Sequence, residues 1–220
     1  MRLAALCGFT AEARLVRRFG LMAFATGGDG VRGRVMAARA AEAADGVLSF
    51  GIAGGLAPRL VAGALLLPRM VIAANGERLA VDVGLHRRVL SALAAAGLHA
   101  ETGDLLALDA IIATPHAKAA QHARHGTLAV DLESLPAART AQAASKPFLV
   151  LRAVADPAGR GLPPAALVGL HPSGHAAPGR VLASVLRQPG QIPALITTAR
   201  DTRRALSALR TALAALRGTL

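Results

Sequence analysis

The sequence predicts a single α/β domain whose parallel or mixed β-sheet is covered by helices. Strand-like runs that are apolar on both faces alternate with helix-like segments along most of the 220 residues. Hydrophobic residues make up 53% of the chain, which is enough for one large core. Neither an internal repeat nor a second core divides the chain, so we expect one domain over residues 1–220.

The expected elements follow this alternation in order. Strand-like runs occupy residues 3–9, 46–52, 63–73, 104–114, 127–130 and 147–155. Helix-like runs occupy residues 11–19, 33–44, 84–97, 115–126 and 133–144.

The C-terminal part has a different character. Residues 156–190 are rich in Pro and Gly and predict loop with short helical pieces, a segment that can act as a lid. Residues 194–217 predict an amphipathic helix. Its apolar stripe consists of Leu206, Leu209, Leu213 and Leu216, edged every seven residues by Arg203, Arg210 and Arg217. The stripe packs on the body or on a second subunit; the alternative is an interfacial helix among lipid headgroups.

Composition excludes several classes of protein. The chain has no Trp or Tyr, so a stacking platform for single-stranded nucleic acid is not expected. Cys7 is the only cysteine, which excludes an internal disulfide and fits a reducing cytoplasm. We expect neither a signal peptide nor a membrane span, because the apolar runs are too short. The net charge of +12 indicates an anionic neighbour without identifying it.

Glycines and carboxylates stand where strands are expected to end. The stretch "FGIAGGLAP" at residues 50–58 resembles a strand that runs into a glycine turn, which is either structural or brings backbone close to a ligand. Asp131 and Glu133 follow another strand; they favour a helix N-terminus or accept hydrogen bonds from ribose hydroxyls. Asp156 closes the last strand as a turn residue or an acid, and Glu12 follows the first strand.

These motifs carry a resemblance. "FGIAGGL", "AVDLES" and "FLVLRAVAD" occur in the order and rough spacing of the purine nucleoside phosphorylase and nucleosidase superfamily. The specific part is a "VD-apolar-E-S" motif followed about twenty residues later by "R-x-x-x-D". The sequence looks most like the hopanoid-associated branch, which is implied to remove adenine from adenosylhopane. The resemblance implies a mixed, barrel-like sheet surrounded by helices, and assembly from dimers.

The resemblance also implies roles for single residues. Glu133 matches the glutamate that holds the ribose hydroxyls, and Asp156 matches the acid that protonates the purine N7. Glu12 matches the glutamate that activates water in the nucleosidases. The pocket would further be lined by Ala53, Gly54, Gly55 and Leu132.

Hydrolysis is favoured over phosphorolysis. The phosphorylases carry an arginine before the glycine stretch, where this chain has Ser49, and a carboxylate at Glu12 suits water but repels phosphate. No cofactor is expected, although phosphate would be a co-substrate in phosphorolysis. An anion site would then form in "TGGDGVRGR" from backbone N–H groups and side chains of Gly28, Gly30, Arg32 and Arg34. The carboxylate of Asp29 in this loop would repel phosphate. Ala155 replaces the serine that often precedes the catalytic aspartate in the family.

Other residues and partners complete the expectations. His116, His122 and His125 are interpreted as surface residues, so no metal site is expected. His171 and His175 receive no chemical role. The expected partners are a small or lipid-linked nucleoside and further copies of the chain, with no nucleic acid. The expected location is the cytoplasm, with peripheral association at the inner face of the membrane as an open alternative. The alternative from another class is a non-catalytic basic protein that binds membrane surfaces or nucleic acid.

Overall fold

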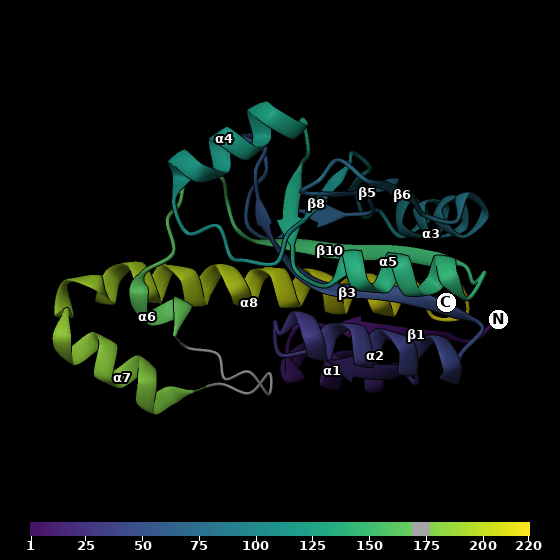
Figure 1. Ribbon diagram of the computed structural model, residues 1–220, viewed down its shortest axis with the longest axis horizontal. Helices are drawn as coiled ribbons and strands as arrows, with labels where there is room; N and C mark the ends of the chain where they lie inside the picture. The colour runs from purple at the N-terminus through teal and green to yellow at the C-terminus, as the bar shows by residue number, and fades with distance from the viewer. Residues whose placement is uncertain (169–176) are drawn as a thin grey trace.

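A computed structural model of the chain describes residues 1–168 and 177–220 (Figure 1). His171 and His175 lie outside the described residues. The sheet contains ten strands. They are β1 (Leu3–Cys7), β2 (Met22–Ala25), β3 (Gly46–Gly55), β4 (Leu65–Leu66), β5 (Met70–Ala73), β6 (Arg78–Ala80), β7 (Ala100–Glu101), β8 (Leu105–Ala107), β9 (Ala129–Asp131) and β10 (Phe148–Asp156).

Helices alternate with these strands as the sequence predicts. They are α1 (Thr10–Arg17), α2 (Gly30–Ala43), α3 (Val83–Ala95), α4 (Pro115–His125), α5 (Ser134–Ala143), α6 (Pro164–Leu167), α7 (Pro178–Arg187), the short 3₁₀ helix η1 (Pro189–Gln191) and α8 (Ile192–Ala215). The expected strand over residues 63–73 is divided into β4 and β5 around Pro68, because proline has no N–H to donate to a ladder.

The sheet is mixed, as predicted. The order of its main path is β6-β5-β8-β9-β3-β10-β4-β7, and β1 joins β3 to β2. β3 pairs in parallel with β1 and β10 but antiparallel with β9. The carboxyl ends of β1, β3 and β10 therefore lie at one edge of the sheet. The segment that follows β9 lies beside these ends.

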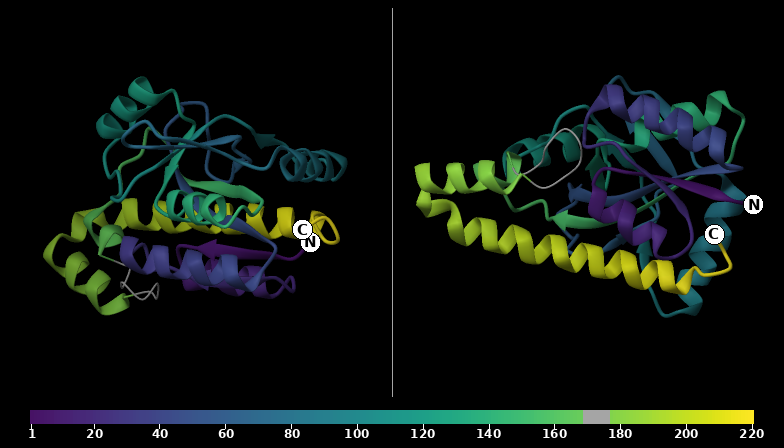
Figure 2. Two further views of the ribbon diagram at one scale, coloured as in Figure 1. Left: turned by 45° about the vertical axis from the view of Figure 1, so that its right-hand side comes forward. Right: turned by 90° about the horizontal axis from the view of Figure 1, so that it is seen from below.

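Helices cover both faces of the central strands. Alternate residues of β10 pack on opposite sides, because side chains of a strand point alternately to its two faces. Leu149 and Leu151 join a core with α1, α3 and α8, whereas Val150 and Val154 join a core with α2 and α5. Figure 1 shows α8 running along β10 and β3, and Figure 2 shows it beside the strands from two further directions. The two strands that carry the site are thus held rigidly from both sides.

A register shift interrupts the pairing of β10 with β3. Val154 pairs with Ala53, but Asp156 pairs with Gly54, so Ala155 is an extra residue, as in a β-bulge. In a regular strand Asp156 would share a face with Arg152. The extra residue places Asp156 on the opposite face, together with its neighbour Gly54.

The glycine stretch differs from its prediction. Residues 53–55 were expected to turn, yet β3 continues through Gly55, because Gly54 and Gly55 pair with Val130 and Ala129 of β9. The strand expected over residues 104–114 is also shorter than predicted, because β8 ends at Ala107.

The C-terminal helix packs on the protein's own core. Leu209, Leu213 and Leu216 are buried, and Leu206 packs against the same cluster. The interpretation of this stripe as a lipid-facing surface is therefore wrong, because the core already occupies it. The segment predicted as loop-rich contains one helix of ten residues, α7, besides α6 and η1. Within the described ranges, no helix combines the length and the apolar character needed to cross a bilayer.

Candidate active site

A cavity of about 790 Å³ opens at the carboxyl ends of β3 and β10. The predicted carboxylates Glu12, Glu133 and Asp156 lie in the wall of this cavity. Four further predicted residues also line it: Gly28, Ala53, Gly54 and Leu132. Gly55 does not; a methyl group there would meet Val154 and Pro157 instead.

Glu12 is buried at the start of α1. Its Oε1 accepts a hydrogen bond from the Ile52 N–H and its Oε2 one from the Phe9 N–H, each at 2.8 Å. Burial raises the pKa of the Glu12 carboxyl, against the lowering effects of Arg152 and of these backbone hydrogen bonds. A carboxylate held this way has a fixed direction and an increased affinity for a proton, as a general base requires.

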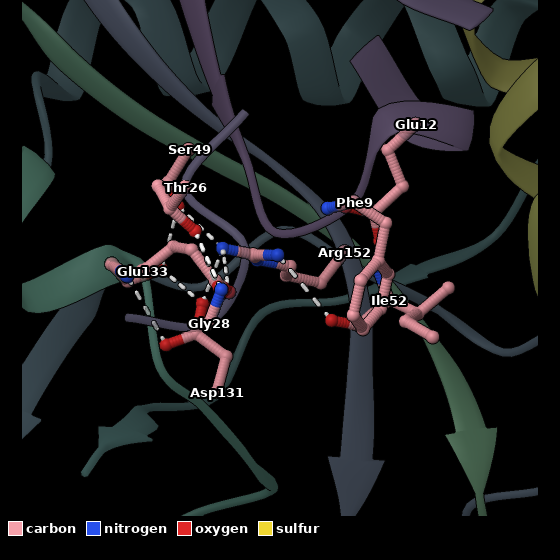
Figure 3. A network of polar contacts seen from close by, with 10 residues as sticks. Phe9, Glu12, Thr26, Gly28, Ser49, Ile52, Asp131, Glu133 and Arg152 are labelled. Carbon is pink, nitrogen blue, oxygen red and sulfur yellow. Dashed lines mark hydrogen bonds and ion pairs between the residues drawn. The ribbon is translucent and has the colours of Figure 1, made fainter. Parts of the chain in front are cut away.

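Arg152 is the centre of a buried network (Figure 3). Its NH2 lies 2.6 Å from Asp131 Oδ2 and 3.4 Å from Glu133 Oε2, and it donates to Ser49 Oγ at 2.7 Å. The hydroxyls of Ser49 and Ser134 are 2.9 Å apart. Ser49 therefore supports the site through Arg152, and its hydroxyl already has two hydrogen-bond partners.

Glu133 lies at the junction of this network and the cavity, as the N-cap residue of α5. The Thr26 hydroxyl donates to its Oε1 at 3.4 Å. The pKa of Glu133 is raised to about 7, chiefly by burial and also by Asp131 and Glu12, whereas Arg152 and Thr26 oppose the rise. Three carboxylates face one guanidinium here, so this side of the cavity favours positive charge.

Asp156 has a cation of its own. The buried ammonium of Lys118, on α4, lies 2.6 Å from Asp156 Oδ2 and donates to the carbonyls of Asp156, Pro157 and Arg160. Burial raises the pKa of Asp156, and Lys118 limits that rise. Lys118 holds one carboxylate oxygen and leaves the other for a ligand.

Three glycines make room for the three carboxylates. A methyl group on Gly51 would lie 2.5 Å from Glu12 Oε1 and 2.7 Å from Arg152 NH1. One on Gly8 would lie 2.8 Å from Glu133 Oε1, and one on Gly54 would lie 3.2 Å from Asp156 Oδ2. The glycines are thus required by the packing of acidic side chains rather than by a phosphate.

The loop considered as an anion site lies partly away from the cavity. Gly28 lines the cavity, but Gly30, Arg32 and Arg34 do not. The Arg32 side chain donates to the Ala25 carbonyl, and the Asp29 carboxylate accepts the Arg32 N–H at 2.7 Å as the N-cap of α2. A carboxylate thus already occupies this helix N-terminus.

Sequence reasoning missed Arg152 and Lys118 as parts of the site. Arg152 carried a signal, since it is a lone charge in an apolar strand and needs a buried partner. Lys118 carried none, because "PHAKAAQHARHG" reads as an exposed helix. In the parts of the chain that the structure describes, no three His, Cys, Asp or Glu side chains are arranged to hold a metal ion.

Comparison with known proteins assigns the fold and the family. The 5′-methylthioadenosine/S-adenosylhomocysteine nucleosidase of Neisseria meningitidis, in complex with methylthio-immucillin-A, matches over 99% of both chains with a TM-score of 0.74 and 18% identity. A mutant of the corresponding Helicobacter pylori enzyme, with 5′-methylthioadenosine in the active site, matches over 99% of this chain and 97% of that chain (TM-score 0.71, 13% identity).

Futalosine hydrolase of Helicobacter pylori covers 97% of both chains, with a TM-score of 0.70 and 13% identity. No curated protein sequence is significantly similar to this one. The sequence profile of the phosphorylase superfamily matches residues 10–168. This match includes Glu12, Glu133 and Asp156, and the chain therefore belongs to the phosphorylase superfamily of enzymes.

Proposed function

We propose that the protein hydrolyses the N-glycosidic bond of an adenosine-type nucleoside and releases adenine. The observation that carries this proposal is the convergence of Glu12, Glu133 and Asp156 on one cavity. The fold neighbours include nucleosidases whose names specify 5′-substituted adenosines, which supports the same reaction class.

The charges of the cavity suit a reaction in which the sugar becomes positive. Cleavage of an N-glycosidic bond passes through an oxocarbenium-like ribose while electrons move into the base. Asp156, whose pKa is raised, donates a proton to the purine ring nitrogen N7 and so stabilises the leaving base. Glu133 accepts hydrogen bonds from the ribose hydroxyls, and the excess of carboxylates over Arg152 stabilises the cationic sugar.

Glu12 supports water as the nucleophile. Its two oxygens are fixed by backbone N–H groups, and burial increases its affinity for the proton that an attacking water must lose. The same carboxylate repels phosphate. Phosphorolysis is the second candidate. It would use the side chains of Arg14 and Arg180, which line the cavity and are exposed.

The remainder of the cavity wall indicates an apolar group on the nucleoside. Its side chains beyond the carboxylates are largely aliphatic or aromatic: Phe9, Ile111, Ile112, Leu162, Leu167 and Leu206. Together with the resemblance to the hopanoid-associated branch, this lining leads us to propose adenosylhopane as the substrate. We further propose a dimer-based homo-oligomer that works in the cytoplasm, at the inner face of the membrane.

Product analysis tests the reaction. Purified protein is incubated with adenosines that carry 5′-alkylthio groups of increasing length, with and without phosphate, and adenine and the sugar product are separated by chromatography. We expect adenine release that ignores phosphate and increases with the length of the alkyl group. Glu12→Gln and Asp156→Asn should each lower kcat by at least ~10²-fold, with a folded far-UV CD spectrum as the control.

Two results would contradict the proposal. Release that requires phosphate and yields a ribose 1-phosphate would establish phosphorolysis. Absence of release from every substrate would favour the non-catalytic alternative.

A further inference from the structure

Helix α7 leaves two leucines and two arginines exposed to solvent. Within the described residues it buries none of its side chains. Ser184 faces inwards, since Gln191 Nε2 donates to its carbonyl at 2.9 Å and to its hydroxyl at 3.2 Å. Leu182 and Leu186, two positions before and after Ser184, lie on the opposite side of the helix and are 59% and 75% exposed. Val181 and Val185 are half-buried, so only part of the apolar side of α7 covers the protein and the two leucines remain in solvent.

The exposed leucines belong to a larger apolar surface. We define the α7 surface as Leu167, Leu182, Leu186, Ile192 and Ile196, all of which are exposed. Figures 1 and 2 show α7 and the beginning of α8 at the outer end of the molecule, beyond the sheet. These side chains come from elements that pack against one another, and exposed apolar groups gathered in this way mark a site of interaction.

The charge of the same segment indicates the kind of partner. Residues 157–200 contain no Asp or Glu, in a chain with a net charge of +12. Arg160 is paired with Asp201, but Arg180, Arg187 and Arg200 are exposed. A second copy carries the same net charge of +12 and offers this segment no excess of anionic groups. A surface of anionic headgroups over an apolar layer complements both the arginines and the leucines.

The α7 surface also adjoins the cavity. Leu167 belongs to both, and Arg180 on α7 and Thr198 on α8 line the cavity from the same side. We infer that the α7 surface docks on an anionic lipid bilayer, with Leu182 and Leu186 among the acyl chains and Arg187 among the headgroups. The inference rests on the proposed function in one respect only: a lipid-linked nucleoside would then reach the cavity from the bilayer.

Co-sedimentation with vesicles tests the inference without any substrate. The full chain is mixed with vesicles of phosphatidylcholine alone and with vesicles that contain phosphatidylglycerol. We expect binding to the anionic vesicles that weakens as salt rises. The double variant Leu182→Ser/Leu186→Ser should bind at least ~10-fold more weakly, because two exposed leucines no longer enter the bilayer. Arg187→Gln should reduce binding less, and mainly at low salt.

A matched pair of exposed valines provides the control. Val35→Ser/Val83→Ser, on α2 and α3, removes a similar kind of surface away from α7 and should leave binding unchanged. Equal binding by both double variants, or a wild-type chain that stays in the supernatant, would overturn the inference. Sedimentation velocity without lipid identifies the other occupant: an oligomer that dissociates only in Leu182→Ser/Leu186→Ser would assign the surface to a second copy.

The result is independent of catalysis. Adenine release from a water-soluble 5′-alkylthioadenosine should be the same for the double variant and the wild type. A nucleosidase that ignores vesicles would overturn only the docking, whereas a vesicle-binding protein without nucleosidase activity would overturn only the proposed function.

Discussion

The cavity has two buried cations, and their surroundings differ. Arg152 faces Asp131 and Glu133, with Glu12 nearby, and its side chain is fully buried. Lys118 faces the single carboxylate of Asp156, which is 17% exposed, and three carbonyl groups. One region therefore carries an excess of acidic groups and the other a matched pair.

The difference corresponds to two chemical tasks. An excess of carboxylates stabilises positive charge on a sugar, but it also adds to the raised pKa of its member Glu133. A matched pair holds one acid in place with one oxygen engaged. We expect the Arg152 region to control stability and charge, and the Lys118 region to control the pH at which Asp156 donates a proton.

The largest effect is expected from removal of the shared cation. Arg152→Met leaves buried carboxylates without a partner and should lower the free energy of unfolding by roughly 3–5 kcal/mol. Lys118→Met should cost less, about 1–3 kcal/mol, because Asp156 reaches solvent or can keep its proton. Urea denaturation at pH 7.5 measures both. Arg139→Met, which breaks an exposed pair with Glu77, should cost under about 1 kcal/mol; equal losses for the two buried cations would remove the distinction.

The next effect concerns Glu133 and pH. A carboxyl whose pKa is raised in the folded state contributes stability below its ordinary pKa of 4.5, and that contribution is lost as pH rises through about 7. Glu133→Gln has no proton to lose. Its stability relative to wild type should therefore increase by roughly 2 kcal/mol between pH 5 and pH 8.

Thermal or urea unfolding across this pH range measures the change. The exposed Glu77, whose pKa is lowered by Arg139, provides a control of opposite sign: Glu77→Gln should show no such increase. A constant difference between Glu133→Gln and wild type would show that Glu133 does not titrate there.

A smaller effect should distinguish the Lys118 region. Lys118 lowers the pKa of Asp156, whereas burial and Asp201 on α8 raise it. Lys118→Met should therefore move the alkaline limit of the pH–kcat profile upwards by roughly one pH unit. Lys118→Arg keeps the charge and should keep the limit. The control for the loss of a lysine is Lys146→Met, because the Lys146 ammonium donates to the Ala41 and Ala44 carbonyls. A lower rate with an unmoved limit would leave Lys118 a purely structural role.

The smallest effect is expected at Gly54. A methyl group there would be 3.2 Å from Asp156 Oδ2, so a slight rotation of the side chain relieves the contact. Gly54→Ala should lower kcat roughly tenfold or less. Gly51→Ala should cost far more, because its methyl would enter the space between Glu12 and Arg152, both buried. A larger loss at Gly54 than at Gly51 would show that Asp156 is held more rigidly than Glu12.

Much of the fold was predictable because periodicity reports which residues are buried. The alternation of apolar runs predicted the mixed sheet and its helices, and the Leu stripe predicted a packed C-terminal helix. The exposure of Leu182 and Leu186 on α7 was not predictable. An amphipathic pattern identifies an apolar side, but the surrounding structure decides whether that side meets a core.

The site was predictable where chain direction determines it and not where tertiary contacts do. Glu12 and Asp156 follow parallel strands that end at one edge, so their meeting could be inferred from the strands alone. Glu133 follows β9, which runs antiparallel to β3, so its place beside them could not. Lys118 reaches Asp156 from 38 positions away in the sequence, and Ser49 reaches Arg152 from 103. Such pairs depend on how α4 and β3 pack against β10, which no local pattern records.

The irregular pairing at Ala155 has a consequence for how the site changes in evolution and in design. The direction of Asp156 depends on the number of residues that precede it, since one extra residue transfers it from one face of the sheet to the other. Deleting Ala155 would keep every functional side chain in the sequence and still withdraw the acid from the cavity. We therefore expect the number of residues before Asp156 to matter as well as its identity.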